Sequence, residues 1–103
     1  MIVEFNNKSL EDLYENKPVS GKPKFSKVVI KKFKKVVQIL KYVESSQQVY
    51  DFKGLHFEKL SGNMADFYSC RVDIKYRLIL SLEMDAILIK EMMIIEDLTN
   101  HYD

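Results

Sequence analysis

The chain has 103 residues, of which 47% are hydrophobic and 30% charged, and its formal net charge is +1. These proportions are typical of one globular domain that folds without a metal or a disulfide. The lone cysteine excludes an internal disulfide, and the first residues lack a secretory pattern, so we expect a cytoplasmic protein. The longest apolar stretch, residues 86–95, is far shorter than the about 20 residues of a membrane helix. We expect it to be a buried strand, and we expect no membrane partner.

Positive charge is concentrated in one segment of the chain. Residues 22–41 contain eight lysines and no acidic residue, whereas the remainder is net acidic. A local positive potential attracts polyanions or acidic protein segments even when the total charge is near zero. The segment therefore favours nucleic acid or an acidic protein as a partner, and a simple solvent-exposed helix face explains it equally well.

The first half of the chain predicts one strand and two helices. Residues 1–6 alternate apolar and polar side chains, and residues 9–12 have the spacing of a capping box that opens a short helix ending near Asn16. Both prolines lie in residues 17–23, which we expect to form a connection. From about Ser26 apolar residues recur at steps of three and four, so one helix face should pack on a sheet while the lysines face outward.

The second half predicts the strands of that sheet. After residues 45–48 end the helix and residues 49–54 connect, we expect strands over residues 55–60, 68–74, 76–82 and 87–95, then a polar tail over residues 96–103. The alternation in these strands places Arg71 and Arg77 on the uncovered face, on either side of a turn. The predicted fold class is α+β, a single domain over residues 1–103 with the N-terminal strand and two helices packed on one face of an antiparallel sheet.

Three charged side chains are candidates for chemistry on the uncovered face. Glu58 should lie among apolar neighbours, where desolvation would make it a base near neutral pH. Arg71 and Arg77 could hold a phosphate, because guanidinium groups stay charged and donate in a planar fork. Simpler interpretations are a surface Glu58 paired with a lysine of the next strand, and either arginine paired with Asp73.

The remaining reactive side chains are two histidines and a cysteine. His101 could donate a proton to a leaving oxygen, although a disordered tail is the simpler interpretation for His101 and Tyr102. His56 is expected to be a packing residue of its strand, and Cys70 a small buried one. Neither zinc-ligand spacing nor a glycine-rich loop is present, so we expect no metal and no cofactor.

Four short motifs follow one another in the second half. They are Glu58-x-Leu60-x-Gly62, Tyr68-Ser69-x-Arg71-Val72, Tyr76-Arg77-Leu78-Ile79 and the closing Asn100-His101-Tyr102. Their order and spacing resemble the RelE superfamily of toxins from type II toxin–antitoxin systems, in particular the HigB and YoeB types. The chain differs from relatives in having Leu-Ser-Gly-Asn at residues 60–63, where a lysine often replaces the serine, and in a longer tail before His101.

The resemblance implies a RelE-like fold and a metal-independent endoribonuclease that cleaves mRNA on the ribosome and arrests translation. By position it implies Glu58 as the general base, Arg77 as the arginine facing the scissile phosphate and Arg71 as a second basic residue beside it. It likewise implies His101 as the general acid and Tyr102 as an aromatic that positions the substrate. The implied partners are the ribosome, mRNA and a cognate antitoxin, which we expect to be a helix-turn-helix protein of the HigA kind.

The sequence leaves two other functions open. A ParE-like toxin, which inhibits a topoisomerase, and an inactive relative that only binds its antitoxin would share the fold without needing catalytic residues. If the protein does act on the ribosome, phosphate contacts should come from exposed lysines. The expected RNA- and ribosome-binding residues are Lys27, Lys31, Lys34, Lys35 and Lys59.

Overall fold

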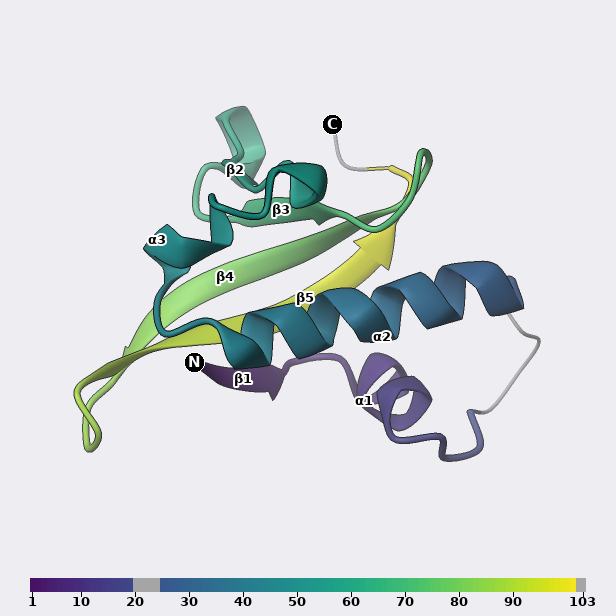
Figure 1. The fold of residues 1–103 in the computed structure, drawn as a ribbon, viewed down its shortest axis with the longest axis horizontal. Coiled ribbons are helices and arrows are strands. Elements are labelled where there is room, and N and C mark those ends of the chain that lie inside the picture. The colour runs from purple at the N-terminus through teal and green to yellow at the C-terminus, as the bar shows by residue number, and fades with distance from the viewer. Residues whose placement is uncertain (20–24, 102–103) are drawn as a thin grey trace.

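The computed structural model describes residues 1–19 and 25–101, which form a sheet with helices packed against it (Figure 1). The helices are α1 (Lys8–Tyr14), α2 (Lys27–Tyr42) and the short α3 (Ser46–Val49), with 3-10 turns η1 (Lys53–Leu55) and η2 (Gly62–Met64). The strands are β1 (Ile2–Phe5), β2 (Glu58–Lys59), β3 (Tyr68–Arg71), β4 (Arg77–Asp85) and β5 (Lys90–Thr99).

The strands form one sheet in the order β1-β5-β4-β3-β2. β1 lies at one edge and runs parallel to β5, and every other neighbouring pair is antiparallel. Figure 1 shows α1 and α2 on the same side of this sheet. The predicted α+β architecture, with helices covering one sheet face, is confirmed.

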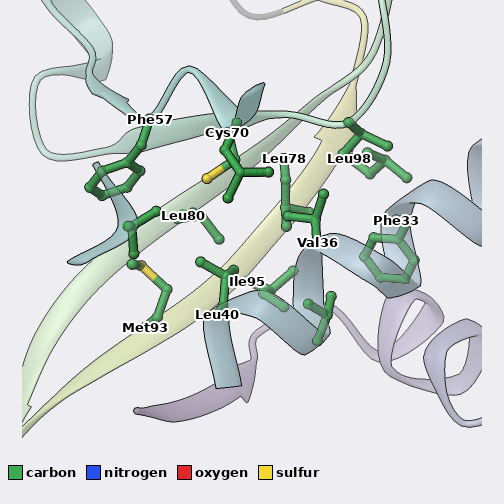
Figure 2. Close-up of a cluster of buried hydrophobic side chains, with 14 of the residues drawn as sticks. Phe33, Val36, Leu40, Phe57, Cys70, Leu78, Leu80, Met93, Ile95 and Leu98 are labelled. Atoms are coloured by element: carbon green, nitrogen blue, oxygen red, sulfur yellow. The ribbon is translucent and has the colours of Figure 1, made fainter. Parts of the chain in front are cut away.

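Helix α2 carries the apolar stripe that covers the sheet. It begins where predicted, because the side chain of Ser26 caps the helix by accepting a hydrogen bond from the Val29 amide at 3.2 Å. The buried residues of the stripe face the buried residues of β4 and β5, as Figure 2 shows. The labelled members of this core include Phe33, Val36, Leu40, Leu78, Leu80, Met93 and Ile95.

Two predictions for the first half differ from the structure. Helix α1 begins at Lys8, and its cap is Asn7, whose Oδ1 accepts a hydrogen bond from the Leu10 amide at 3.2 Å; the predicted box at residues 9–12 is not the cap. The predicted connector over residues 49–54 is partly helical, because α3 and η1 occupy half of it. Residues 20–23 of the other predicted connector lie outside the described part of the chain.

The strand predicted over residues 55–60 contains only Glu58 and Lys59. Leu55 ends η1 and is buried in the core, and His56 follows with a left-handed backbone (φ 45°, ψ 50°). The strand predicted over residues 68–74 ends at Arg71, and Ile74, expected on the covered face, is 88% exposed in the turn that follows. Both strands are short because the chain turns immediately beside the candidate site.

The prediction of a buried strand at residues 87–95 is wrong for its first residues. Ile87, Leu88 and Ile89 form the exposed tip of the β4–β5 hairpin. Asp85 Oδ1 closes this turn by accepting hydrogen bonds from the amides of Ile87 and Leu88 at 3.0 and 2.7 Å. Side-chain hydrogen bonds of this kind favour a turn even in an apolar segment.

The predicted polar tail is strand up to Thr99 because β5 contains a bulge. Ile79 lies opposite Asp97 and Leu80 opposite Ile95, so Glu96 is the extra residue. Its carboxylate accepts hydrogen bonds from Ser81 Oγ at 2.6 Å and from Asn6 Nδ2 at 2.8 Å. The bulge shifts the alternation by one residue, which turns Leu98 into the core.

Candidate active site

The candidate residues of β2, β3 and β4 share the sheet face that the helices leave uncovered. Arg71 lies directly opposite Arg77, and Ser69 lies directly opposite Glu58. Cross-strand partners point to the same face, whereas sequence neighbours in a strand point to opposite faces. Cys70 is buried in the helix-covered core, so Ser69 and Arg71 face the other way. The predicted placement of both arginines on one face is confirmed.

Arg77 is a buried cation held by hydrogen bonds. Its Nε and Nη2 donate to Ser69 Oγ at 3.1 and 2.8 Å, and Nη2 also donates to the His56 main-chain oxygen at 2.7 Å. Ser69 is fully buried, and only 11% of the Arg77 side chain is exposed. A guanidinium held at several donors keeps one orientation, so Arg77 supplies positive charge at a defined point.

Glu58 lies next to this cation at the surface. Its Oε1 is 3.5 Å from Arg77 Nη2, and 57% of its side chain is exposed. The expectation of apolar surroundings is therefore wrong, because the carboxylate faces solvent on one side and a guanidinium on the other. Within residues 1–19 and 25–101, no lysine pairs with Glu58, so the simpler alternative is not seen either. The arrangement leaves the carboxylate oriented and accessible.

Arg71 is exposed, and its guanidinium meets the ring of His56. The distance from Arg71 Nη1 to His56 Nε2 is 3.5 Å. Asp73, considered above as a partner for either arginine, instead accepts hydrogen bonds from the amides of Tyr76 and Lys75 at 2.6 and 2.8 Å. These bonds, led by that from Tyr76, hold the pKa of Asp73 below its usual range. Asp73 thereby closes the turn that brings Arg71 opposite Arg77.

His56 is a site residue that the sequence analysis missed. It was assigned to strand packing, yet it is exposed, has a left-handed backbone and contacts both arginines, one through its carbonyl and one through its ring. Histidine occurs in left-handed conformations more often than most residues. This preference was the only local signal that His56 leaves its strand. Its left-handed backbone depends on where η1 ends and on the hydrogen bond from Arg77.

His101 is placed at the same end of the sheet, since it lies two residues beyond Thr99, the β5 partner of Arg77. Its described contacts are with Thr99, whose Oγ1 accepts a hydrogen bond from the His101 amide at 2.9 Å and donates one to its carbonyl at 3.2 Å. Among the contacts described for residues up to 101, none joins its imidazole to Glu58, Arg71 or Arg77. Tyr102 lies outside the described residues.

Other reactive groups are arranged for structure. Cys70 is buried as predicted, and desolvation raises the pKa of its thiol to about 12 although the charge of Arg77 acts in the opposite direction. A thiol of this kind is a poor nucleophile at neutral pH. Within residues 1–19 and 25–101, no three His, Cys, Asp or Glu side chains cluster in a way that could hold a metal ion. The same ranges contain no helix with the length and apolar character needed to cross a membrane.

Most of the predicted RNA-binding lysines lie on the outer side of α2. Lys27, Lys31 and Lys35 are exposed, whereas Lys34 is half-buried and donates a hydrogen bond to Asn16 Oδ1. Lys59 is exposed on β2, beside Glu58. A hollow of about 440 Å³ lies between this helix and the end of β3, where Arg71 lines it. Its charged lining residues are Lys32, Lys35, Arg71 and Asp73.

The fold is similar to that of solved bacterial toxins. A YoeB/ParE toxin from Agrobacterium tumefaciens superimposes with a TM-score of 0.60 at 17% identity, over 99% of this chain and 100% of that chain. A chain of the YoeB–YefM complex from Staphylococcus aureus has a TM-score of 0.55 at 21% identity, and one from the YoeB dimer of the same organism 0.54 at 19%. Each covers 99% of this chain and 98% of the other.

Sequence comparison identifies the family. No curated protein matches the chain at a significant level. The family model described as the RelE-like toxin of the type II toxin–antitoxin system HigB matches residues 3–93. This segment contains Glu58, Arg71 and Arg77, and it ends before His101. Because the match spans most of the chain, the protein belongs to the HigB-type RelE-like toxins of type II toxin–antitoxin systems.

Proposed function

We propose that this toxin is a ribosome-dependent endoribonuclease that cleaves mRNA during translation. The observation that carries the proposal is the convergence of an accessible carboxylate and two guanidinium groups on one uncovered sheet face: Glu58 beside Arg77, and Arg71 opposite Arg77. A base next to fixed positive charge suits the cleavage of a phosphodiester. A toxin that only occupies a protein surface would have no need for this arrangement.

In the proposed reaction the ribose 2′-hydroxyl attacks the adjacent phosphorus. Glu58 takes the hydroxyl proton, and Arg71 and Arg77 stabilise the charge that develops on the phosphoryl oxygens. The step uses side chains alone and requires no metal. Because the nucleophile is the 2′-hydroxyl, DNA should not be cleaved. The leaving 5′ oxygen must take a proton from a general acid, and the resemblance implies that Tyr102 positions the substrate.

The proposed partners follow from the family and from the charge of α2. We assign the protein a cognate antitoxin, of the helix-turn-helix HigA kind; one structural neighbour is solved in a YoeB–YefM complex. The ribosome and its mRNA are the proposed targets, which places the toxin in the cytoplasm. Lys35 shares a hollow with Arg71, so the basic side of α2 offers a continuous path from the site along an RNA backbone.

Primer extension on a translated mRNA after induction tests the activity. The wild type should produce new 5′ ends that require translation, and Arg77→Ala should lower their yield at least about 100-fold, because the fixed charge at the phosphate is lost. Arg77→Ala cleavage within a few-fold of the wild type would refute the mechanism. DNA-damage signalling without mRNA cleavage would favour the ParE-like alternative, and absence of any growth defect would favour an inactive relative.

A charge-reversal pair tests the role of α2. The double variant Lys31→Glu and Lys35→Glu should weaken binding to purified ribosomes, and this binding should depend steeply on salt in the wild type. The matched control reverses the exposed Lys17 and Lys90, which lie outside α2. If the double variant lost antitoxin binding and kept ribosome binding, the lysines would instead be assigned to recognition of the antitoxin.

A further inference from the structure

We propose that His56, rather than His101, is the general acid that protonates the leaving 5′ oxygen. This inference rests on the proposed endoribonuclease function and concerns the same site. The chain contains two histidines, so the choice of imidazole is a choice between these residues. The structure distinguishes them by their contacts with the arginines.

His56 contacts both arginines of the site. Its carbonyl oxygen accepts a hydrogen bond from Arg77 Nη2 at 2.7 Å, and its ring Nε2 lies 3.5 Å from Arg71 Nη1. A phosphate bound by Arg71 would therefore lie within reach of the same imidazole. His101, in contrast, has described contacts only with Thr99, through its main chain.

The backbone of His56 supports a functional role. Its φ of 45° is in the left-handed region, which costs conformational energy for a residue with a side chain. The hydrogen bond from the buried Arg77 holds this conformation, and the ring remains exposed instead of packing into the core. A strained conformation maintained by surrounding groups is typical of functional sites.

Glu58 as the base and His56 as the acid would then lie on either side of the two guanidinium groups. Glu58 follows His56 by two residues, and its carboxylate lies beside Arg77 while the imidazole lies beside Arg71. Arg71 from β3 thus lies beside the imidazole, Arg77 from β4 binds the main chain of the same residue, and Glu58 from β2 lies beside Arg77. This gives each proton-transfer group its own cation.

The proposed cleavage step conserves protons and electrons. An anionic phosphodiester takes over the hydrogen bonds of Arg71 and favours the protonated imidazole. The 2′ oxygen then bonds to phosphorus as its proton passes to Glu58, and the P–O5′ bond breaks as its electron pair takes the proton of His56. The products are a 2′,3′-cyclic phosphate and a 5′-hydroxyl.

Replacing the bridging 5′ oxygen by sulfur tests this assignment. A thiolate leaves without a proton, so a defect in the general acid should disappear on the sulfur-bridged mRNA. The variants are His56→Asn, His101→Asn and Glu58→Gln, assayed in single turnover on ribosomes that carry mRNA with oxygen or sulfur at the mapped cleavage site. Asparagine tolerates a left-handed backbone, so His56→Asn retains the carbonyl that binds Arg77.

We expect His56→Asn to lower cleavage of the oxygen-bridged mRNA by at least about 100-fold and to approach the wild type on the sulfur-bridged mRNA. Glu58→Gln should be defective on both, and His101→Asn should stay within a few-fold of the wild type on both. Wild-type activity of His56→Asn, or a defect that sulfur does not restore, would overturn the inference. A wild-type protein that cuts neither substrate would instead refute the proposed function itself.

The test remains decisive if His56→Asn fails to fold. His101→Asn is then compared with the wild type as a function of pH on both substrates. Retained activity with an alkaline decline on the oxygen-bridged mRNA alone assigns the acid to His56, the other imidazole of the chain. A loss that sulfur restores assigns the acid to His101 and overturns the proposal.

Discussion

The guanidinium of Arg77 donates a hydrogen bond to the main-chain oxygen of His56 at 2.7 Å, across the intervening strand β3. This contact joins the start of β4 to the segment that leads into β2. It places Glu58 within 3.5 Å of the same guanidinium. One buried cation therefore positions a carboxylate and a main-chain turn that come from distant parts of the sequence.

Ser69→Ala should destabilise the fold as well as the site. Ser69 Oγ accepts two hydrogen bonds from the Arg77 guanidinium and is fully buried, so the substitution removes a buried acceptor from a charged donor. We expect the free energy of unfolding to fall by about 1–3 kcal/mol in urea titrations. The control Ser61→Ala, at an exposed position, should change it by less than about 0.5 kcal/mol. Equal effects of both variants would contradict this interpretation of Ser69.

The two arginines should respond differently to lysine. Arg77→Lys removes the planar fork from a buried network, and we expect the free energy of unfolding to fall by about 1.5–3 kcal/mol. Arg71→Lys changes an exposed side chain and should alter stability by less than about 0.5 kcal/mol. Chemical denaturation of both variants, with mRNA cleavage measured in parallel, checks the contrast. If Arg71→Lys proved the more destabilising, the burial argument would be wrong.

Ile89→Asn should stabilise the protein. Ile89 has a φ of 53° and is 78% exposed at the tip of the β4–β5 hairpin, so it carries the strain of a left-handed β-branched residue without burying its side chain. Asparagine adopts this conformation more readily, and we expect a gain of about 1 kcal/mol in the free energy of unfolding. Ile87→Asn, at an exposed position without a positive φ, is the matched control. A similar gain in both variants would point to solubility rather than to backbone strain.

Cys70 should make stability decrease at alkaline pH. Burial raises the pKa of the folded thiol to about 12, above the about 8.5 of an exposed cysteine. The folded state thus holds the proton more tightly, so this contribution is complete below about pH 8.5 and is lost as the pH rises toward 12. In urea titrations between pH 9 and 11, the wild type should lose stability faster than Cys70→Ala, by up to about 1.4 kcal/mol per pH unit. Parallel curves for the two proteins would exclude the effect.

Several features were predictable because they depend on local pattern. The stripe of α2 has helical spacing and its cap is a serine, so both its face and its start were predicted correctly. The alternation around Cys70 likewise predicted the face on which Arg71 lies. The turn at Asp73 was predicted as well, and its side chain forms the hydrogen bonds that close it.

The errors occur where a tight turn or a contact distant in sequence overrides the pattern. Residues 87–89 are apolar and predicted a buried strand, but the hairpin formed with β4 places them at an exposed tip. The strand was predicted to end at Ile95, before the polar tail. The bulge at Glu96, held by Ser81 and Asn6, continues it to Thr99.

The amino-acid sequence by itself determined the layers of this protein, the sheet face on which the arginines lie and, through its motifs, the family. The layers and the face of the arginines follow from side-chain periodicity, which acts between near neighbours, whereas the family follows from the resemblance of the motifs. Only the tertiary structure decided that Glu58 pairs with Arg77 and that His56 leaves its strand to contact both arginines. Such contacts depend on strand register and on the desolvation of a guanidinium, and both exist only after residues distant in sequence have been brought together.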